Sequence, residues 1–241
     1  MDNDYFKKHN DIFELFVIAH KLAVYHNLIE GVWNHISFEL PDTSNHILFT
    51  PGHTHWDLVN LENLTVLDEN GSLISGENVP IPIAWIIHKP IHLINPEYKC
   101  LIHIHTPYIT SMSINSHFET RLTQHSSIFH NDVNYFNEYM EKNNDSDIFE
   151  LMSQSIEGNR VLFLKNHGAI ISGSTIGEAY MSTYLLERAC MFQILSSNTN
   201  PSLIPEKIVL KIKDNFFDNL CQKHFNGFVD YYKFKLDNHS T

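Results

Sequence analysis

The 241-residue sequence has few cysteines, few basic residues and no long apolar run. Its three cysteines, Cys100, Cys190 and Cys221, are an odd number without a Cys-x-x-Cys spacing, which argues against disulfides or a zinc ribbon and favours reduced, buried thiols. Lys and Arg total 16 against 28 Asp and Glu and form no basic stripe, so neither nucleic acid nor an anionic membrane is expected as a partner. No apolar run approaches the roughly 18 residues of a membrane span. The acidic N-terminus does not resemble a signal peptide, and a cytoplasmic protein is predicted.

Nucleotide-binding glycine loops are also absent. The sequence has no Gly-x-Gly-x-x-Gly and no phosphate loop ending in Lys-Ser/Thr, and Gly173 to Gly177 misplaces its serine for the nucleophile elbow of a hydrolase. Nucleotide cofactors and serine hydrolysis are therefore not expected. Histidine, by contrast, is abundant, because the 17 histidines outnumber lysine and arginine together. A large change of net charge is expected between about pH 7 and pH 5.

Apolar periodicity predicts one α/β domain over residues 1–241, with a central sheet and helices outside it. An amphipathic helix is expected over 10–28 with Asp11 as its cap, and a capping box of Thr175 and Glu178 opens another helix. Further helices are expected over 84–93, 148–156, 175–195 and about 205–225, and the acidic stretch 138–147 is expected to be a loop. Strands are expected over 35–40, 47–50, 64–68, 73–74, 99–105, 161–164 and 169–172.

Two histidines near the middle of the chain, His103 and His105, lie in a segment with strand character. Because side chains alternate along a strand, both imidazoles point to the same face, close enough to share one ion. Zinc, iron, manganese and cobalt all accept imidazole nitrogen, and a third ligand has to come from elsewhere in the chain. His53 and His55 repeat the spacing, and His167 precedes a glycine that permits a sharp turn at a strand end. Each of these histidines also fits a purely structural role.

The order of these motifs resembles a known family. His103 to Pro107 reads His-Ile-His-Thr-Pro, and Lys165 to Gly168 reads Lys-Asn-His-Gly about sixty residues later, ahead of the helix after Thr175. With Trp33 to Ser37, Pro51-Gly52, 68–71 and Ile87-His88, this pattern resembles the class II aldolase and adducin superfamily, and most closely its adducin-like branch. The resemblance implies a three-layer α/β/α fold around a nine-stranded, mainly antiparallel sheet. It also implies a homotetramer with active sites at subunit interfaces. It also implies a divalent metal ion with His103, His105 and His167 as ligands.

Two positions depart from the aldolase pattern. The aldolases have a proton-transferring glutamate four residues before the histidine that matches His88, and here that position is Ala84. Alanine cannot move a proton, so the usual aldol mechanism lacks its main catalyst. The phosphate cradle of the sugar-phosphate aldolases is also altered, because Asn34 to Ser37 and Phe49 to His53 introduce histidine, proline and bulk. These changes favour a small, non-phosphorylated carbonyl compound or 2-oxo acid as substrate.

The first hypothesis is a metal-dependent carbon–carbon lyase, in which the ion acts as a Lewis acid on a carbonyl. Proton transfer then falls to His35 or Tyr135, or to Tyr231 or Tyr232 from a neighbouring subunit. Ser37, His53 and His88 are expected to bind the substrate or shape its pocket, together with His55. Trp33, Trp56 and Trp85 suit an aromatic or apolar substrate, although core packing is the expected role of each.

Two alternatives stay open. Three neutral imidazoles also hold Fe(II), and the resemblance extends to nonheme iron oxygenases that decarboxylate aryl pyruvates, so an oxidative decarboxylase on the same three histidines is the second hypothesis. The third is a catalytically inactive scaffold, since the adducin head domains keep the fold without aldolase activity. All three candidate ligands are nevertheless present here, which favours an enzyme.

Overall fold

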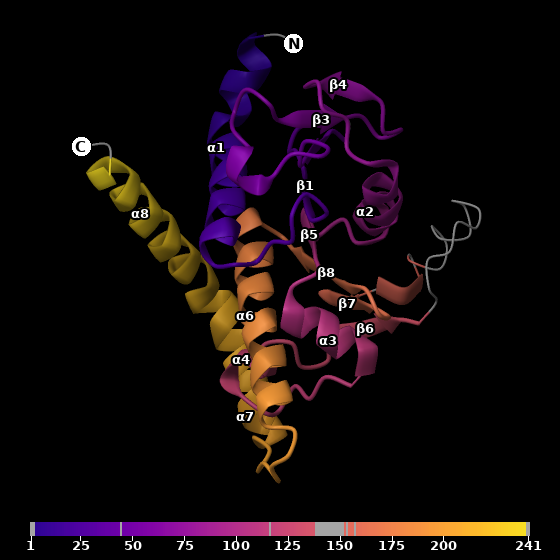
Figure 1. The fold of residues 1–241 in the computed structure, drawn as a ribbon, viewed down its shortest axis with the longest axis vertical. Coiled ribbons are helices and arrows are strands. Elements are labelled where there is room, and N and C mark those ends of the chain that lie inside the picture. The colour runs from indigo at the N-terminus through magenta and orange to yellow at the C-terminus, as the bar shows by residue number, and fades with distance from the viewer. Residues whose placement is uncertain are drawn as a thin grey trace.

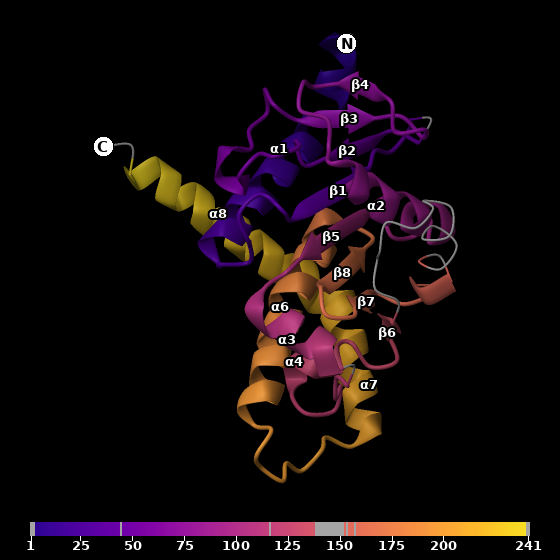
Figure 2. The same cartoon turned by 45° about the vertical axis from the view of Figure 1, so that its right-hand side comes forward.

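A computed structural model describes residues 3–43, 45–115, 117–137, 152, 154–156 and 158–239. Within these ranges one sheet of eight strands runs in the order β4-β3-β2-β1-β5-β8-β7-β6 (Figure 2). Every neighbouring pair is antiparallel except β6 and β7, which are parallel. The strands are β1 His35–Glu39, β2 Ile47–Phe49, β3 Thr65–Leu67, β4 Leu73–Ser75, β5 Cys100–Ile104, β6 Val133–Phe136, β7 Val161–Leu164 and β8 Gly168–Gly173.

Helices cover both faces of the sheet. Figure 1 shows α1, α6 and α8 on one side of the sheet and α2 on the other. The longer helices are α1 Asn3–Tyr25, α2 Pro82–Ile94, α3 Pro107–Asn115, α6 Ile176–Leu195, α7 Glu206–Asn215 and α8 Cys221–His239. Shorter ones are η1 Trp56–Leu58, α4 Gln124–Ser127 and η2 Phe216–Leu220, a π-helical turn between α7 and α8. The expected three-layer α/β/α architecture with a mainly antiparallel sheet is confirmed, although the described residues form eight strands rather than nine.

Alternation along the central strand β5 divides the core into two. Ile102 and Ile104 pack into the larger cluster with residues of α1 and α6, whereas Leu101 packs with Ile87 and Ile91 of α2. His103 follows Leu101 by two residues, so it lies on the α2 face of the sheet. This placement puts a polar side chain near the centre of the sheet, on the face where α2 packs together with Met152 and Ile156.

Several sequence-based boundaries are wrong. α1 begins at Asn3 rather than near Asp11, because no glycine or proline interrupts the residues before Asp11. The C-terminal helix does not stop near 225, since the π turn carries it into α8 and on to His239. The capping box is only half formed: the Thr175 hydroxyl accepts from the Glu178 N–H at 3.0 Å, while the Glu178 carboxylate contacts Arg160 and Ser174.

Other expectations have mixed outcomes. Seven of the eight strands and the helix around 84–93 lie close to their predicted places, whereas β6, α3 and α4 are not among the predicted elements. The three cysteines are free and buried, as predicted. The loop expected over 138–147 and most of the helix expected over 148–156 lie outside the described residues. Among the described helices, none has the length and apolar character needed to cross a bilayer.

Candidate metal centre

Three histidine side chains meet where β5 ends. His103 is the fourth residue of β5, His105 follows the strand, and His167 lies in the turn between β7 and β8. One nitrogen from each lies within 4.8 Å of the others, and the Nε2 atoms of His103 and His105 are 2.8 Å apart. The ring centroids are 4.6 to 5.0 Å apart, with His103 fully buried and the other two half-buried.

The backbone around these residues explains why His167 can come so close. Antiparallel pairing of β5 with β8 places Ile104 opposite Ala169, so the β7–β8 turn lies beside the end of β5. A Cβ at Gly168 would lie 2.3 Å from the Ile104 carbonyl oxygen and 2.9 Å from the His105 ring. The left-handed residue of the turn is Asn166, with φ of 57°. Gly168 is therefore required for the close approach of two strands, and the sharp turn that we had expected it to supply belongs to Asn166.

Hydrogen-bond partners fix the orientation of two of the rings. The Nδ1 of His103 lies 3.0 Å from the carbonyl oxygen of Ala169, which can only accept, so Nδ1 carries the ring proton. The Nδ1 of His105 faces the Glu30 carboxylate at 3.5 Å. Because each of these partners accepts a proton from Nδ1, the Nε2 atoms of the neutral His103 and His105 rings are unprotonated. These two Nε2 atoms point at each other. A backbone carbonyl and a carboxylate behind the ring are the partners that metal-ligating histidines typically have.

Electrostatics favour the neutral rings that a metal requires. Burial lowers the pKa of His103 well below its usual value and that of His105 to about 4, and it also lowers the pKa of His167. In each case desolvation of the charged form is the largest cause, and the neighbouring imidazoles add to it for His103 and His105. Two bare nitrogens 2.8 Å apart with a third beside them form a donor set that fits one divalent cation.

Two other predicted site residues lie next to this cluster. His35 of β1 pairs with His103 of β5 across the sheet, and the two rings are 4.8 Å apart. The Nδ1 of His35 is 2.8 Å from Nε2 of His88, which comes from α2. Ser37 is fully buried, and its hydroxyl contacts His88 rather than an open pocket. His35 also lines a shallow pocket with Ala84.

The remaining predicted residues are spread more widely. His53 lines the same pocket as His35, whereas His55 caps η1 by accepting from the Asp57 N–H. The Tyr135 hydroxyl accepts from the Phe118 N–H at 2.8 Å and its ring stacks on Phe163, so its contacts lie away from the three histidines.

Of the three tryptophans, Trp56 is a fully buried core residue, and the partly buried Trp85 packs against the smaller core cluster that contains Phe49 and Ala84. Trp56 is 1% exposed, and its indole N–H donates to the Asn34 carbonyl. Trp85 is half-buried beside Lys89, and Trp33 is 66% exposed, so core packing is wrong for Trp33. Trp33 lies in the loop before β1, two residues after Gly31, whose φ is 56°.

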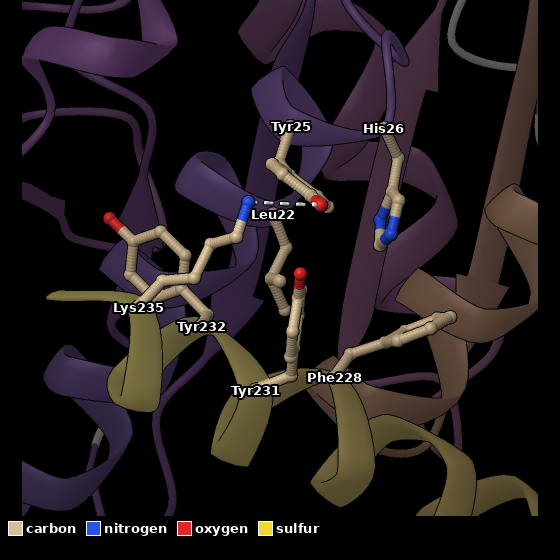
Figure 3. A pocket seen from close by; sticks show the side chains of 7 residues that line it. All are labelled: Leu22, Tyr25, His26, Phe228, Tyr231, Tyr232 and Lys235. Carbon is tan, nitrogen blue, oxygen red and sulfur yellow. Dashed lines mark hydrogen bonds between the residues drawn. The ribbon is translucent and has the colours of Figure 1, made fainter. Parts of the chain in front are cut away.

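Tyr231 and Tyr232 lie on α8 against α1, in a pocket that Figure 3 shows from close by. The Lys235 ammonium lies 4.7 Å from the centre of the Tyr25 ring and 3.4 Å from its hydroxyl. Within this one chain the pocket is a contact between two helices. Neither tyrosine contacts the three histidines, so any role for them needs a second subunit, as the sequence suggested.

Two acidic residues near the cluster escaped the sequence analysis. Glu30, in the loop before β1, faces His105 as described above. Glu187 of α6 is buried, and its carboxylate accepts from the Thr106 hydroxyl at 2.6 Å and from the Tyr108 and Ile109 N–H groups at 3.2 and 2.9 Å. It thereby holds the first turn of α3, directly after His105. Neither residue stands in a motif, and only the fold brings them to this place.

Comparison with known proteins agrees with this geometry. A family model described as the class II aldolase and adducin N-terminal domain matches residues 14–194. An adducin-related protein of Schizosaccharomyces pombe is 27% identical over 223 residues, which cover 87% of this chain and 67% of the relative.

Solved structures share the fold at lower sequence identity. An aldolase II superfamily protein from Pseudomonas syringae has a TM-score of 0.82 at 22% identity, covering 92% of this chain and 91% of its own. An L-fuculose 1-phosphate aldolase from Glaciozyma antarctica has a TM-score of 0.81 at 19% identity, covering 92% of this chain and 89% of its own.

Proposed function

The chain belongs to the class II aldolase and adducin family, and on that basis we propose that it is a metal-dependent carbon–carbon lyase acting on a non-phosphorylated carbonyl compound or 2-oxo acid. The observation that carries the proposal is the convergence of His103, His105 and His167, with one nitrogen from each within 4.8 Å of the others. We assign these three as the metal ligands, with zinc as the first candidate and Fe(II), manganese or cobalt as others.

The neighbouring residues support a division of roles. A divalent ion bound here supplies Lewis-acid polarisation of a substrate carbonyl. His35 is assigned as the group that moves a proton, because it lies beside His103 and lines the pocket where Ala84 offers no carboxylate. His88 holds His35 through a hydrogen bond, and His53 lies at the rim of the same pocket. We assign Tyr135 no direct role within one subunit.

The lining of that pocket favours a substrate without a phosphate group. Val32, Pro51, Pro80 and Ile81 contribute apolar surface, and none of the described residues that line the pocket is a lysine or arginine. A phosphate monoester carries close to two negative charges and is normally held by such cations or by clustered backbone N–H groups. The Glaciozyma relative acts on a phosphorylated sugar by its name, so we propose that this chain differs from it in substrate class.

We also propose that the active form is a cytoplasmic homotetramer, with the exposed Trp33 beside β1 at a subunit contact. Light scattering coupled to size-exclusion chromatography measures the mass directly. A monomeric Trp33→Ser variant from a tetrameric parent supports the assignment, and a tetrameric variant overturns the role of Trp33.

Metal analysis tests the central assignment. Untagged protein is purified without chelators under low oxygen, and the bound metals are measured by elemental analysis. We expect one ion per chain in the parent protein, none in His103→Ala, and one in the control His117→Ala, whose side chain is exposed. Stoichiometric metal in His103→Ala, His105→Ala and His167→Ala alike would overturn the ligand set.

The identity of the ion separates the lyase from its alternatives. Zinc, together with cleavage of a 2-oxo acid or aldol in a substrate panel, supports the lyase. Iron, together with oxygen consumption on adding a 2-oxo acid, supports the oxidative decarboxylase instead. Folded protein that binds no ion after reconstitution supports the non-enzymatic scaffold, a candidate that the adducin-related relative and Ala84 favour.

A further inference from the structure

A cavity of about 450 Å³ lies among the C-terminal helices, away from the candidate metal centre. Residues of α4, α6, α7, η2 and α8 form its walls, and these helices gather at the lower end of the molecule in Figure 1. The cavity shares no lining residue with the three histidines or with the pocket of His35. Small-molecule pockets have volumes of roughly 300 to 1,000 Å³, so this cavity has room for such a ligand.

The buried side chains that line the cavity are apolar, and the exposed ones are polar. The buried ones are Ile128, Met181 and Phe216, and the exposed ones are Gln124, Asn215 and His224. An apolar interior with a few polar groups is the usual composition of a small-molecule site. Among the described residues that line the cavity there is no aspartate or glutamate. The lining therefore suits a ligand with an apolar body and without a positive charge.

One wall of the cavity departs from regular helix. Phe216–Leu220 forms the π-helical turn η2, and the first and last residues of this turn both line the cavity. A π turn is rare in proteins and is found frequently at functional sites. The irregular turn therefore lies where the cavity is, which favours a binding role for this place over a packing defect.

An arginine without an acidic partner lies beside the cavity. Arg188 is half-buried on α6, and its guanidinium carbon is 3.6 Å from the centre of the Tyr184 ring, which lines the cavity. Among the described residues, no carboxylate forms an ion pair with Arg188. The preceding residue, Glu187, is engaged with α3 instead.

The charge of Arg188 also reaches the cavity wall at α4. Desolvation by burial lowers the pKa of His125, and repulsion from Arg188 lowers it further. His125 lines the cavity and is therefore neutral at pH 7. Arg188 thus supplies a positive charge that no described carboxylate balances, and an anionic group on a ligand would balance it.

We propose that this cavity binds a small organic acid with one carboxylate and an apolar body, of which octanoate is a simple example. The carboxylate pairs with Arg188, whose planar guanidinium suits two-point contact with a carboxylate. The apolar body packs against Met181, Leu185 and Phe216. The site stands apart from the three histidines, so the proposal does not depend on the reaction performed there.

Isothermal titration calorimetry of the full-length protein tests the two parts of the ligand separately. Octanoate, octanol and octylamine share one alkyl chain and differ in charge. We expect octanoate to bind at one site per chain and about 10-fold or more tightly than octanol, because a hydrogen bond between charged groups changes affinity by at least about that factor. Octylamine should not bind. Equal affinities for octanoate and octanol would overturn the pairing with Arg188.

Variants of the chain locate the binding site. Arg188→Gln should weaken octanoate binding about 10- to 100-fold and leave octanol binding unchanged. Lys207→Gln removes an exposed cation of α7 as the matched control and should change neither. Leu185→Trp fills the cavity and should abolish binding of both compounds, which keeps the test decisive if Arg188→Gln does not fold. His103→Ala should bind octanoate as the parent does, and loss of binding there would place the acid at the metal centre and overturn the proposal.

A second copy of the chain is the competing occupant of the cavity. Light scattering gives the mass of the protein at each concentration used for the titrations. An octanoate affinity that falls as the mass rises would show that another subunit covers the cavity, and this result would overturn the proposal. An affinity independent of the mass supports it. Octanoate binding that persists in both Arg188→Gln and Leu185→Trp would place the acid elsewhere and refute the assignment.

Discussion

Removing the Glu187 carboxylate is expected to loosen the first turn of α3 and, through it, the metal cluster. This side chain accepts three hydrogen bonds from Thr106, Tyr108 and Ile109, two of them from backbone N–H groups at the start of a helix. Hydrogen bonds to a charged group contribute about 1.5 kcal/mol or more each, and buried donors left unpaired add a penalty. Water entering the space recovers part of this loss. We therefore expect Glu187→Ala to lower the free energy of unfolding by about 3 to 5 kcal/mol.

Urea unfolding followed by circular dichroism measures this loss, with the exposed Glu62→Ala as a control. Glu187→Gln keeps one carbonyl acceptor and is expected to lose less than half as much. Because α3 starts two residues after His105, metal affinity should fall by about 10- to 100-fold in Glu187→Ala, as it does when partners behind metal ligands are lost. A loss below about 1 kcal/mol would show that the carboxylate does not hold this turn.

Three further predictions follow from the same structure. Gly168→Ala should lower the free energy of unfolding by about 2 kcal/mol or more and abolish metal binding, because the new Cβ would lie 2.3 Å from the Ile104 carbonyl oxygen. Thermal unfolding measures the loss of stability, and elemental analysis measures the bound metal. A stable variant that still binds the metal would contradict the packing argument. His20 is fully buried and its pKa falls from 6.5 to about 4. Its contribution to stability is thus complete above pH 6.5 and shrinks by about 3 kcal/mol as the pH falls toward 4, because only the unfolded chain takes up the proton. His26 has a pKa of about 4 and therefore also destabilises the folded protein as the pH falls. The urea concentration at the unfolding midpoint should decrease from pH 7.5 to pH 4.5. The decrease should be smaller in the His20→Gln variant than in the parent protein. Finally, a chelator should lower the unfolding temperature of the parent protein but not that of His103→Ala, and equal shifts in both would place the bound metal elsewhere.

The sequence predicted the part of the site that depends on short-range geometry. His103 and His105 share a face because side chains alternate along any strand, and their place in a strand followed from the apolar residues around them. Their convergence with His167 came from a family resemblance, because no local rule predicts which turn lies next to which strand. Whether the three bind a metal stays a prediction until the ion is measured.

The contacts between elements escaped the sequence. Ser37 was expected to touch substrate, but the rotation of α2 over β1 puts its hydroxyl against His88 and His92, and that rotation is set by packing. Glu30 lies in a loop and Glu187 in a helix that is distant in the sequence, so their spacing in the sequence does not predict that they lie near the three histidines. Trp33 is a case in which the sequence predicted a contact that the structure lacks. Its hydrophobicity predicted a place in the core, but the side chain is exposed.

The strand order has a consequence for how the site comes into being. Strands β1 to β4 come from residues 35–75 and form one half of the sheet, while β5 to β8 come from residues 100–173 and form the other. The two halves meet only at the seam between β1 and β5, where His35 lies opposite His103. All three candidate ligands, His103, His105 and His167, belong to the second half, whereas His35 belongs to the first. Pairing of the two halves therefore brings the proposed proton-transfer residue to a set of ligands that one half supplies by itself.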